Sequence, residues 1–341
     1  MNVQYGTDQI EGVTQADESQ PTGRTPATWR WLLAAHGKQL FPVGLLAVLW
    51  AIFTALNPRF IELHNLITIL QQAVTLLVVA LGMTLVIIAG SIDLSVGSIL
   101  GLSTVTAASF APSMGVAAAI PACLVGLIAG TINGVVFAKG KVPSFIVTLG
   151  TMVIYRGIIL LYTSGSTIPL DQETFVNVFA GRSFGIPHSI PIAAGLAVLC
   201  SLILHFTVFG REVRAVGGGE RVAVLTGIKV DRVKIGMFMF LGLLAGMAGV
   251  LHGAWSMAAT SQTGEGLELD AIAAVVVGGT PLTGGMGSVE RTVLGSLIMV
   301  ILSNGMNMIG VDPYLQSIVK GTVLVAAVFV TIDRRKIGII K

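Results

Sequence analysis

The chain has 341 residues, of which 54% are hydrophobic and only 11% are charged, and its mean hydropathy is +0.87. Soluble domains carry about 25% charged residues, so this composition excludes a protein with a water-exposed surface all round. The formal net charge is only +3, and nucleic acid is not among the partners that we expect. The apolar residues are gathered into runs of about twenty, the length that spans a bilayer as a helix.

Ten apolar runs, separated by charged residues, glycine and proline, predict an all-α polytopic membrane protein with about ten transmembrane helices. The runs lie near residues 40–57, 66–89, 96–112, 115–138, 143–163, 190–209, 235–257, 269–280, 291–309 and 315–332. The third and eighth are short and rich in Gly, Ser and Thr, which predicts short or broken helices among the others or along a cavity. Cys123 and Cys200 both lie inside runs, so neither a disulfide nor a cysteine metal site is expected.

The lysines and arginines of the connections predict that both termini face the cytoplasm, because positively charged loops stay on that side. With this N-in/C-in topology the inner side holds Arg24, Arg30, Lys38, Lys139, Lys141, Arg211, Arg214, Arg221, Lys229, Arg232, Lys234, Arg291, Arg334, Arg335, Lys336 and Lys341. Only Arg59 and Arg182 fall outside. Arg156 and Lys320 lie within spans near their outer ends, where long side chains can reach the interface.

This topology divides the chain into one transmembrane domain, residues 39–335, and two cytoplasmic tails. Residues 1–38 are polar and are expected to be a disordered tail, and residues 336–341 form the second tail. The longest outer connection, residues 164–189, is either a solvated loop or a surface for a periplasmic partner. The longest inner connection spans residues 210–234.

Segment 90–98, with the sequence GSIDLSVGS, interrupts the apolar pattern between the second and third runs. Asp93 or Ser95 could cap the third helix by accepting hydrogen bonds from its free N–H groups. Alternatively, both residues belong to a gate or to the path of a solute. A charge at the bilayer centre costs about 2.5–3.5 kcal/mol on insertion scales, so we do not expect Asp93 to face lipid.

Within the 210–234 connection, residues 220–225 favour a short helix bracketed by glycines. Such a helix projecting into the cytoplasm is typical of a docking element for another protein. The alternative is a positively charged loop that fixes topology and contacts anionic lipid. Its candidate docking residues are Glu220, Arg221, Val224, Leu225 and Gly227.

In segment 264–285, acidic residues lead into an apolar stretch that ends in a glycine-rich break containing Thr280. Glu268 and Asp270 favour a helix N-terminus, where negative charge is stabilising. Phosphate binding at the glycines is a weak alternative, because no GxxxxGK[ST] motif occurs in the chain.

Amide side chains inside the runs either bond neighbouring helices or line a solute path. They are Gln71, Gln72, Asn133, Asn304 and Asn307. Glycines at four-residue spacing, at 126, 130 and 134 and again at 242 and 246, predict close helix packing.

The order of these segments resembles the ribose, xylose and arabinose branch of the ABC-importer permeases, in the binding-protein-dependent transport superfamily. The matching motifs are GSIDLSVGS at 90–98, VPSFIVTLGTM at 142–152, TGI at 226–228, GLELDAIAA at 266–274, and the glycines at 278–279 and 284–285. The resemblance covers residues 45 to 335, and the five motifs follow in order.

The resemblance implies a non-catalytic permease of the bacterial inner membrane that imports a monosaccharide by alternating access. It implies three partners: an ATP-binding cassette subunit that carries ATP and Mg²⁺, a periplasmic solute-binding protein, and a second permease copy or related permease. The docking residues of the 210–234 connection would couple to the ATPase. The gate and path would be drawn from Asp93, Ser95, Gln71, Gln72, Asn133, Asn304 and Thr280.

One departure from the family pattern concerns the docking loop, where a common Gly-Gly-Asn-Glu-Ala becomes Gly218-Gly219-Glu220-Arg221-Val222. The departure leaves the placement of the loop unchanged and alters the residues beside Glu220.

Three alternatives remain at this point. Permeases of the same superfamily carry nucleosides, autoinducer sugars or amino acids. A secondary transporter or channel would work without ATP, but would be expected to place coupling charges near mid-membrane. A membrane scaffold would not explain two broken spans.

Overall fold

The computed structural model describes residues 28–331, with side chains from residue 41 to residue 329. The chain divides into two units, Met1–Lys38 and Gln39–Lys341, and helix α1 (Thr28–Leu56) passes from the first into the second. The fold below is that of the second unit. Most of the predicted 1–38 tail and all of the 336–341 tail lie outside the described residues.

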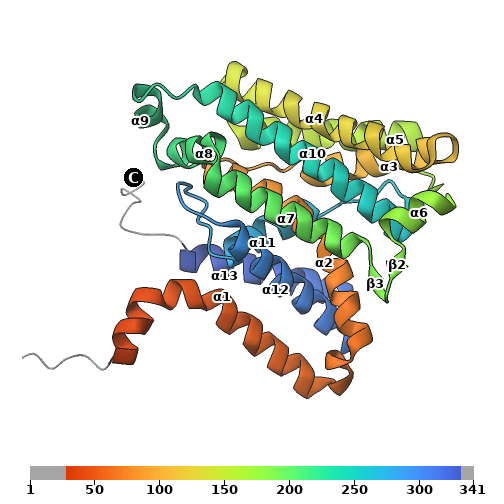
Figure 1. The fold of residues 1–341 in the computed structure, drawn as a ribbon, viewed down its shortest axis with the longest axis horizontal. Coiled ribbons are helices and arrows are strands. Elements are labelled where there is room, and N and C mark those ends of the chain that lie inside the picture. Colours follow the sequence, from red (N-terminus) through yellow and green to blue (C-terminus); the bar gives the residue numbers. More distant parts are fainter. Residues whose placement is uncertain (1–27, 332–341) are drawn as a thin grey trace, which may run out of the picture. The chain divides into compact units, whose positions relative to one another are not determined.

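The second unit is built almost entirely of helices (Figure 1). After α1 come α2 (Leu63–Ile88), α3 (Val96–Met114), α4 (Ala119–Gly140), α5 (Ser144–Thr163), α6 (Glu173–Phe179), α7 (Ser189–Phe206), α8 (Val208–Gly218), α9 (Glu220–Leu225), α10 (Val230–Ser256), α11 (Leu267–Val277), α12 (Val289–Met308) and α13 (Pro313–Thr331). Short 3-10 helices, η1 (Pro58–Ile61) and η2 (Gly115–Ala118), join α1 to α2 and α3 to α4.

Each of the ten predicted runs overlaps one of these helices. Six helical stretches are long and apolar enough to cross a membrane, namely Leu63–Ile88, Val96–Gly140, Ser144–Thr163, Ser189–Phe206, Val230–Ser256 and Val289–Met308. Phe41–Leu56 and Pro313–Phe329 are shorter apolar helices. Helix α11 has only 11 residues, as expected of the broken eighth run. The third run is longer than predicted, because α3 continues through Pro112 to Met114 for 19 residues.

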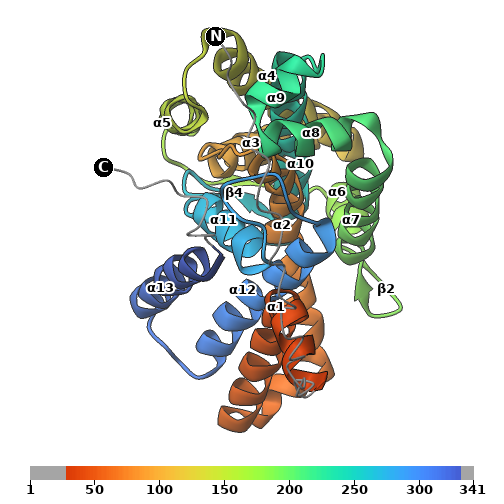
Figure 2. The ribbon, with the colours of Figure 1, turned by 90° about the vertical axis from the view of Figure 1, so that its left-hand side faces the viewer.

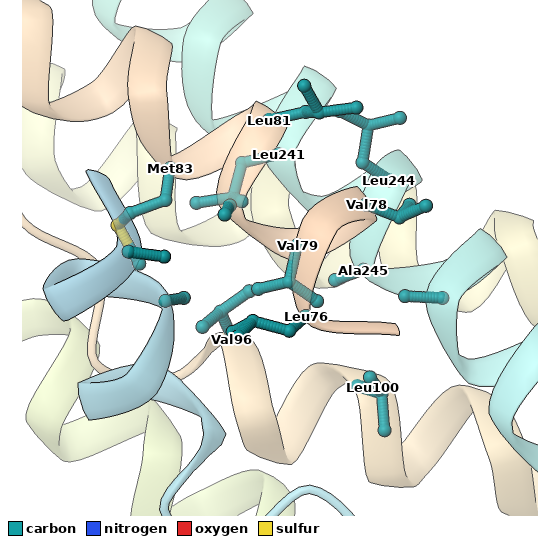
Figure 3. Close-up of a cluster of buried hydrophobic side chains, with 14 of the residues drawn as sticks. Leu76, Val78, Val79, Leu81, Met83, Val96, Leu100, Leu241, Leu244 and Ala245 are labelled. Carbon is teal, nitrogen blue, oxygen red and sulfur yellow. The ribbon is translucent and has the colours of Figure 1, made fainter. Parts of the chain in front are cut away.

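The core is centred on α2 and α10. All residues of α2 from Val78 to Ile88 are buried, which places other elements around every face of that half of the helix. Figure 3 shows Val79 of α2, Leu241 of α10 and Leu100 of α3 among the side chains gathered there. This half of α2 is apolar on every face because it is buried within the bundle, and not only because it could contact lipid.

The glycine ladders bring α4 and α10 into backbone contact (Figure 1). A methyl group added at Gly130 would collide with the carbonyl oxygen of Phe238, and one added at Gly126 would collide with that of Gly242. Gly246 in turn leaves room for the backbone of α4. The prediction that both ladders mark close helix packing is confirmed, and the structure shows that they pack against each other.

The 164–189 connection is folded and not merely a solvated loop. It contains strand β1 (Ile168–Pro169), helix α6, and the two-residue strands β2 (Arg182–Ser183) and β3 (Ile186–Pro187), which pair with each other. Strand β1 pairs with β4 (Ala258–Ala259), directly after α10. Phe175 of α6 is fully buried. The 164–189 connection and the segment that follows α10 are therefore joined by strand pairing at the same end of the bundle.

Two interruptions of the helices lie next to each other. The first break, residues 89–95, follows α2 and turns at Gly90, whose φ of +75° favours glycine. The second break, residues 278–288, follows α11. The amide of Gly285 donates a hydrogen bond of 2.8 Å to the carbonyl oxygen of Ile88, and Gly284 packs against Gly90. Figure 2 shows α11 beside α2, the helices that lead into these breaks.

Candidate functional site

A buried polar network fixes the first break to the start of α3. The Asp93 carboxylate oxygen Oδ1 accepts hydrogen bonds of 2.7 Å from both the backbone N–H and the hydroxyl of Ser95. Both side chains are fully buried. The carboxylate thereby closes a two-residue turn within the break, directly before the first residue of α3.

The same network reaches the neighbouring helices. Asn133 of α4 donates from Nδ2 to the hydroxyl of Ser95 at 2.7 Å and to Asp93 Oδ2 at 3.5 Å. The backbone amide of Ile92 donates to the hydroxyl of Ser144, the first residue of α5, at 3.3 Å. The first break is therefore held between α3, α4 and α5. The bond from Asp93 ends at Ser95, the N-cap residue of α3, and the Ser95 side chain makes no capping hydrogen bond to the helix. Capping by Asp93 and a gating role for the network both stay predictions.

Two further path candidates are buried away from cavities. Thr280 is fully buried at the second break, where it packs beside Gly287, and Asn304 of α12 is 5% exposed. Within the described residues, Thr280 Oγ1 and Asn304 Oδ1 have no hydrogen-bond partner. Each is a buried polar atom whose partner must come from water, a solute or another arrangement of the helices.

A cavity of about 290 Å³ lies between α2, α10, α11 and α12. Its lining comprises Gln72, Thr75, Leu76, His252, Trp255, Leu267, Asp270, Met299, Val300, Ser303 and Asn307. A smaller cavity of about 180 Å³ shares four of these residues and extends to Glu265. Of the seven predicted path residues, only Gln72 lines either cavity.

Sequence reasoning missed most of this lining. His252 and Trp255 sit three residues apart near the end of the seventh run, where they were read simply as part of an apolar span. Their spacing puts them on one face of α10, and their rings lie 6.0 Å apart. A histidine and a tryptophan together on one helix face were the signal that could have identified this surface.

Asp270 and Lys320 form an ion pair at the edge of the cavity. Lys320 Nζ of α13 lies 2.9 Å from Asp270 Oδ2 of α11, and the two side chains are 28% and 26% exposed. Sequence reasoning gave Lys320 no ionic partner, and the structure supplies Asp270 as one. Arg156 also has specific partners, since its guanidinium donates to the carbonyl oxygens of Ser261 and Thr263 at 2.7 and 2.9 Å.

Helix α9, predicted from the glycine brackets, forms as expected over Glu220–Leu225. Its apolar side chains are unusually exposed: Val224 is 56% and Leu225 is 86% exposed. Val222, which was not among the predicted docking residues, is 64% exposed. Among the predicted docking residues, Arg221 and Gly227 are also exposed, and Gly227 turns the chain after the helix with a φ of +85°.

Helix α9 is anchored to the bundle at its first residue. Glu220 Oε1 lies 2.8 Å from Lys234 Nζ of α10, and Lys234 also lies 4.6 Å above the ring centroid of Phe137. The buried side of α9 is Ala223, which is 2% exposed. One end of α9 is thus fixed to α10 while Val224 and Leu225 face outward.

Helix α8 connects this exposed helix to the two breaks. Gly217 of α8 lies so close to them that a methyl group there would collide with the carbonyl oxygen of Ile88 and come within 2.7 Å of the Gly285 nitrogen. At the neighbouring Gly218 a methyl group would meet nothing within 4 Å. The two glycines therefore differ: a side chain at Gly217 would point into the breaks and one at Gly218 would not, although the Gly218 backbone also lies beside Gly285.

The comparison with protein families finds one match, over residues 65–328, to the permease component of branched-chain amino acid transport systems. The matched region runs from α2 into α13 and includes both breaks, α8, α9 and the cavity. It covers more than half of the chain.

Curated relatives match over nearly the whole length. The chain is 41% identical to the ribose import permease protein of Escherichia coli K12 over 321 residues, 92% of this chain and 98% of that protein. It is 42% identical to that of Bacillus subtilis 168 over 305 residues, 88% of this chain and 94% of that protein. The L-arabinose permease protein of Azospirillum brasilense is 33% identical over 302 residues, 86% of this chain and 88% of that protein. No solved structure matches.

Proposed function

The chain belongs to the family of membrane permease components of bacterial ABC importers, and we propose that it forms the membrane path for a monosaccharide. Pentoses are the first candidates for this solute. The observation that carries the solute class is the identity of about two residues in five with ribose import permeases across more than nine-tenths of the chain. The chain itself is the non-catalytic subunit, and a partner hydrolyses ATP.

The proposed topology has ten crossings with both termini in the cytoplasm. Its support is the distribution of Lys and Arg, together with the helices found at all ten predicted runs. On this topology α8 and α9 face the cytoplasm, and the β1–β4 pairing lies at the outer end. The outer end would then present a folded surface to a solute-binding protein.

Helix α9 is the proposed docking element for the ATP-binding cassette subunit. Its exposed valines and leucine would be buried in the partner, and burying a Leu side chain stabilises a contact by about 1.5–3 kcal/mol. Because Gly217 of α8 packs against Ile88, the last residue of α2 before the first break, and against Gly285 of the second break, movement of the docked helix would be passed to both breaks. The first break, with Asp93 and Ser95, would then change its packing against α4 and α5.

The proposed assembly contains two copies of this chain, two cassettes and one binding protein. The test is reconstitution of the assembly in lipid vesicles with D-ribose, L-arabinose and D-xylose as probes. We expect ATP-dependent accumulation of at least one of these sugars, blocked by vanadate and insensitive to a protonophore. Accumulation without the cassette subunit would overturn the proposal.

A second candidate follows from the family description, which refers to branched-chain amino acids. Leucine uptake in the same vesicles, competed by isoleucine and valine but not by sugars, would support it. This outcome would keep the ATP-driven mechanism and change the solute class.

A further inference from the structure

The cavity between α2, α10, α11 and α12 carries polar groups that have no partner within the described residues. The Gln72 amide, the Thr75 hydroxyl and the His252 imidazole line it and make no side-chain hydrogen bond to any described residue. Asp270 uses only Oδ2 for its ion pair, which leaves Oδ1 without a partner there. Donors and acceptors from three helices therefore converge on one space.

The electrostatic balance of this cavity favours an uncharged solute. Asp270 is the one carboxylate in the lining of the larger cavity, and Lys320 lies 2.9 Å from it. An anionic solute would meet the carboxylate, and a cationic solute would compete with Lys320 for it. A neutral hydroxyl can donate to the free oxygen of Asp270 without disturbing the pair.

The remaining lining suits a small ring with apolar C–H faces. Trp255 is 44% exposed, and its ring is set edge-on to His252 at 67°. The apolar part of the wall comprises Leu76, Leu267, Met299 and Val300. A volume of about 290 Å³ is at the lower end of the roughly 300–1,000 Å³ typical of small-molecule sites. Apolar walls with a few convergent polar groups are the usual composition of such sites.

We propose that this cavity is a recognition subsite for a neutral polyhydroxylated solute on its way through the permease. Gln72 and Asp270 bond its hydroxyls, Trp255 and His252 pack against its ring, and Lys320 acts as a positioning residue that orients Asp270. The inference rests on the proposed sugar transport and deepens it. It assigns solute contacts to residues of α2, α10 and α11 and not to the buried Asp93 network.

The test uses the complete reconstituted importer, with D-ribose, L-arabinose and D-xylose as probes and uptake and ATP hydrolysis as separate readouts. Gln72→Ala is expected to reduce uptake of the transported sugar about tenfold, the effect of losing a hydrogen bond from a confined site. Hydrolysis stimulated by loaded binding protein should persist. The matched control is Thr68→Ala, one turn earlier on the same helix and outside both cavities, whose hydroxyl donates to the His64 carbonyl oxygen of its own helix; it should transport normally. Normal uptake by Gln72→Ala would overturn the proposal.

Asp270 needs a separate control, because its loss also breaks an ion pair. Asp270→Asn should reduce uptake, and the exchange Asp270→Lys with Lys320→Asp should not restore it, since the carboxylate would then lie on α13. Restored uptake in the exchanged variant would show that only the ion pair matters and would overturn the role of Asp270. If the wild-type importer accumulates none of the three sugars but accumulates leucine, the sugar assignment itself fails, which is a different result.

Discussion

Gly217 provides the sharpest test of the proposed coupling between ATP hydrolysis and the helix breaks. In Gly217→Ala the new methyl group would collide with the carbonyl oxygen of Ile88 and approach the Gly285 nitrogen to 2.7 Å. Overpacking of this kind costs about 1–3 kcal/mol when backbone must move. The penalty applies only to the state in which α8 packs against Ile88 and Gly285, as it does in this structure. A state in which α8 has moved away from them would not be destabilised.

A penalty of about 1–3 kcal/mol on one of two alternating states changes their ratio by roughly 5–150-fold. We therefore expect Gly217→Ala to lower uptake at least about fivefold while the permease still assembles with its cassette subunit. The assay is sugar uptake and ATP hydrolysis by reconstituted importer, normalised to assembled complex.

The neighbouring glycine supplies the control. Gly218→Ala adds the same methyl group one position on, where nothing lies within 4 Å. Removing a glycine there reduces the entropy of the unfolded chain, so this variant should be neutral or stabilised by about 0.4–1 kcal/mol. Equal transport by the two variants would refute the coupling route from α8 to the breaks.

Three further predictions concern docking, packing and the buried network. Leu225→Arg should prevent co-purification of the cassette subunit while membrane insertion is unchanged, because an 86% exposed leucine contributes little to the fold itself. Gly130→Val should lower the thermal unfolding temperature in detergent, whereas Gly150→Val, with nothing within 4 Å, should not; equal shifts would contradict the α4–α10 contact. Asp93→Asn keeps an oxygen acceptor for the Ser95 amide, so it should assemble better than Asp93→Ala, and equal loss would argue against capping.

The sequence was informative where local composition decides the structure. Apolar runs located the helices because each helix needs a continuous stretch of side chains compatible with lipid or with a buried core. Glycines beside Asp93 and Thr280 located the two breaks, and glycines on either side of residues 220–225 located α9. These features depend on neighbours within a few residues.

The remainder depends on pairs far apart in the chain. Lys320 and Asp270 are 50 residues apart, and no local pattern announces that α13 brings one beside the other. Strands β1 and β4 are also far apart in the sequence, and no local pattern predicts that they pair. From the sequence, the 164–189 connection could therefore not be distinguished from a solvated loop. The cavity was missed for the same reason, since its lining comes from four separate helices.

Helix α11 connects the proposed solute subsite to the second break. Asp270, in its first turn, lines the cavity, and the second break begins directly after its last residue, Val277. With 11 residues it is about 16 Å long at 1.5 Å per residue, too short to bridge the hydrocarbon core of about 30 Å. On the proposed mechanism a rigid element of this length moves as one piece, so a displacement of the second break at Gly278, directly after α11, would also move the carboxylate of Asp270. The ion pair with Lys320 would then change together with the break, because Lys320 belongs to a different helix.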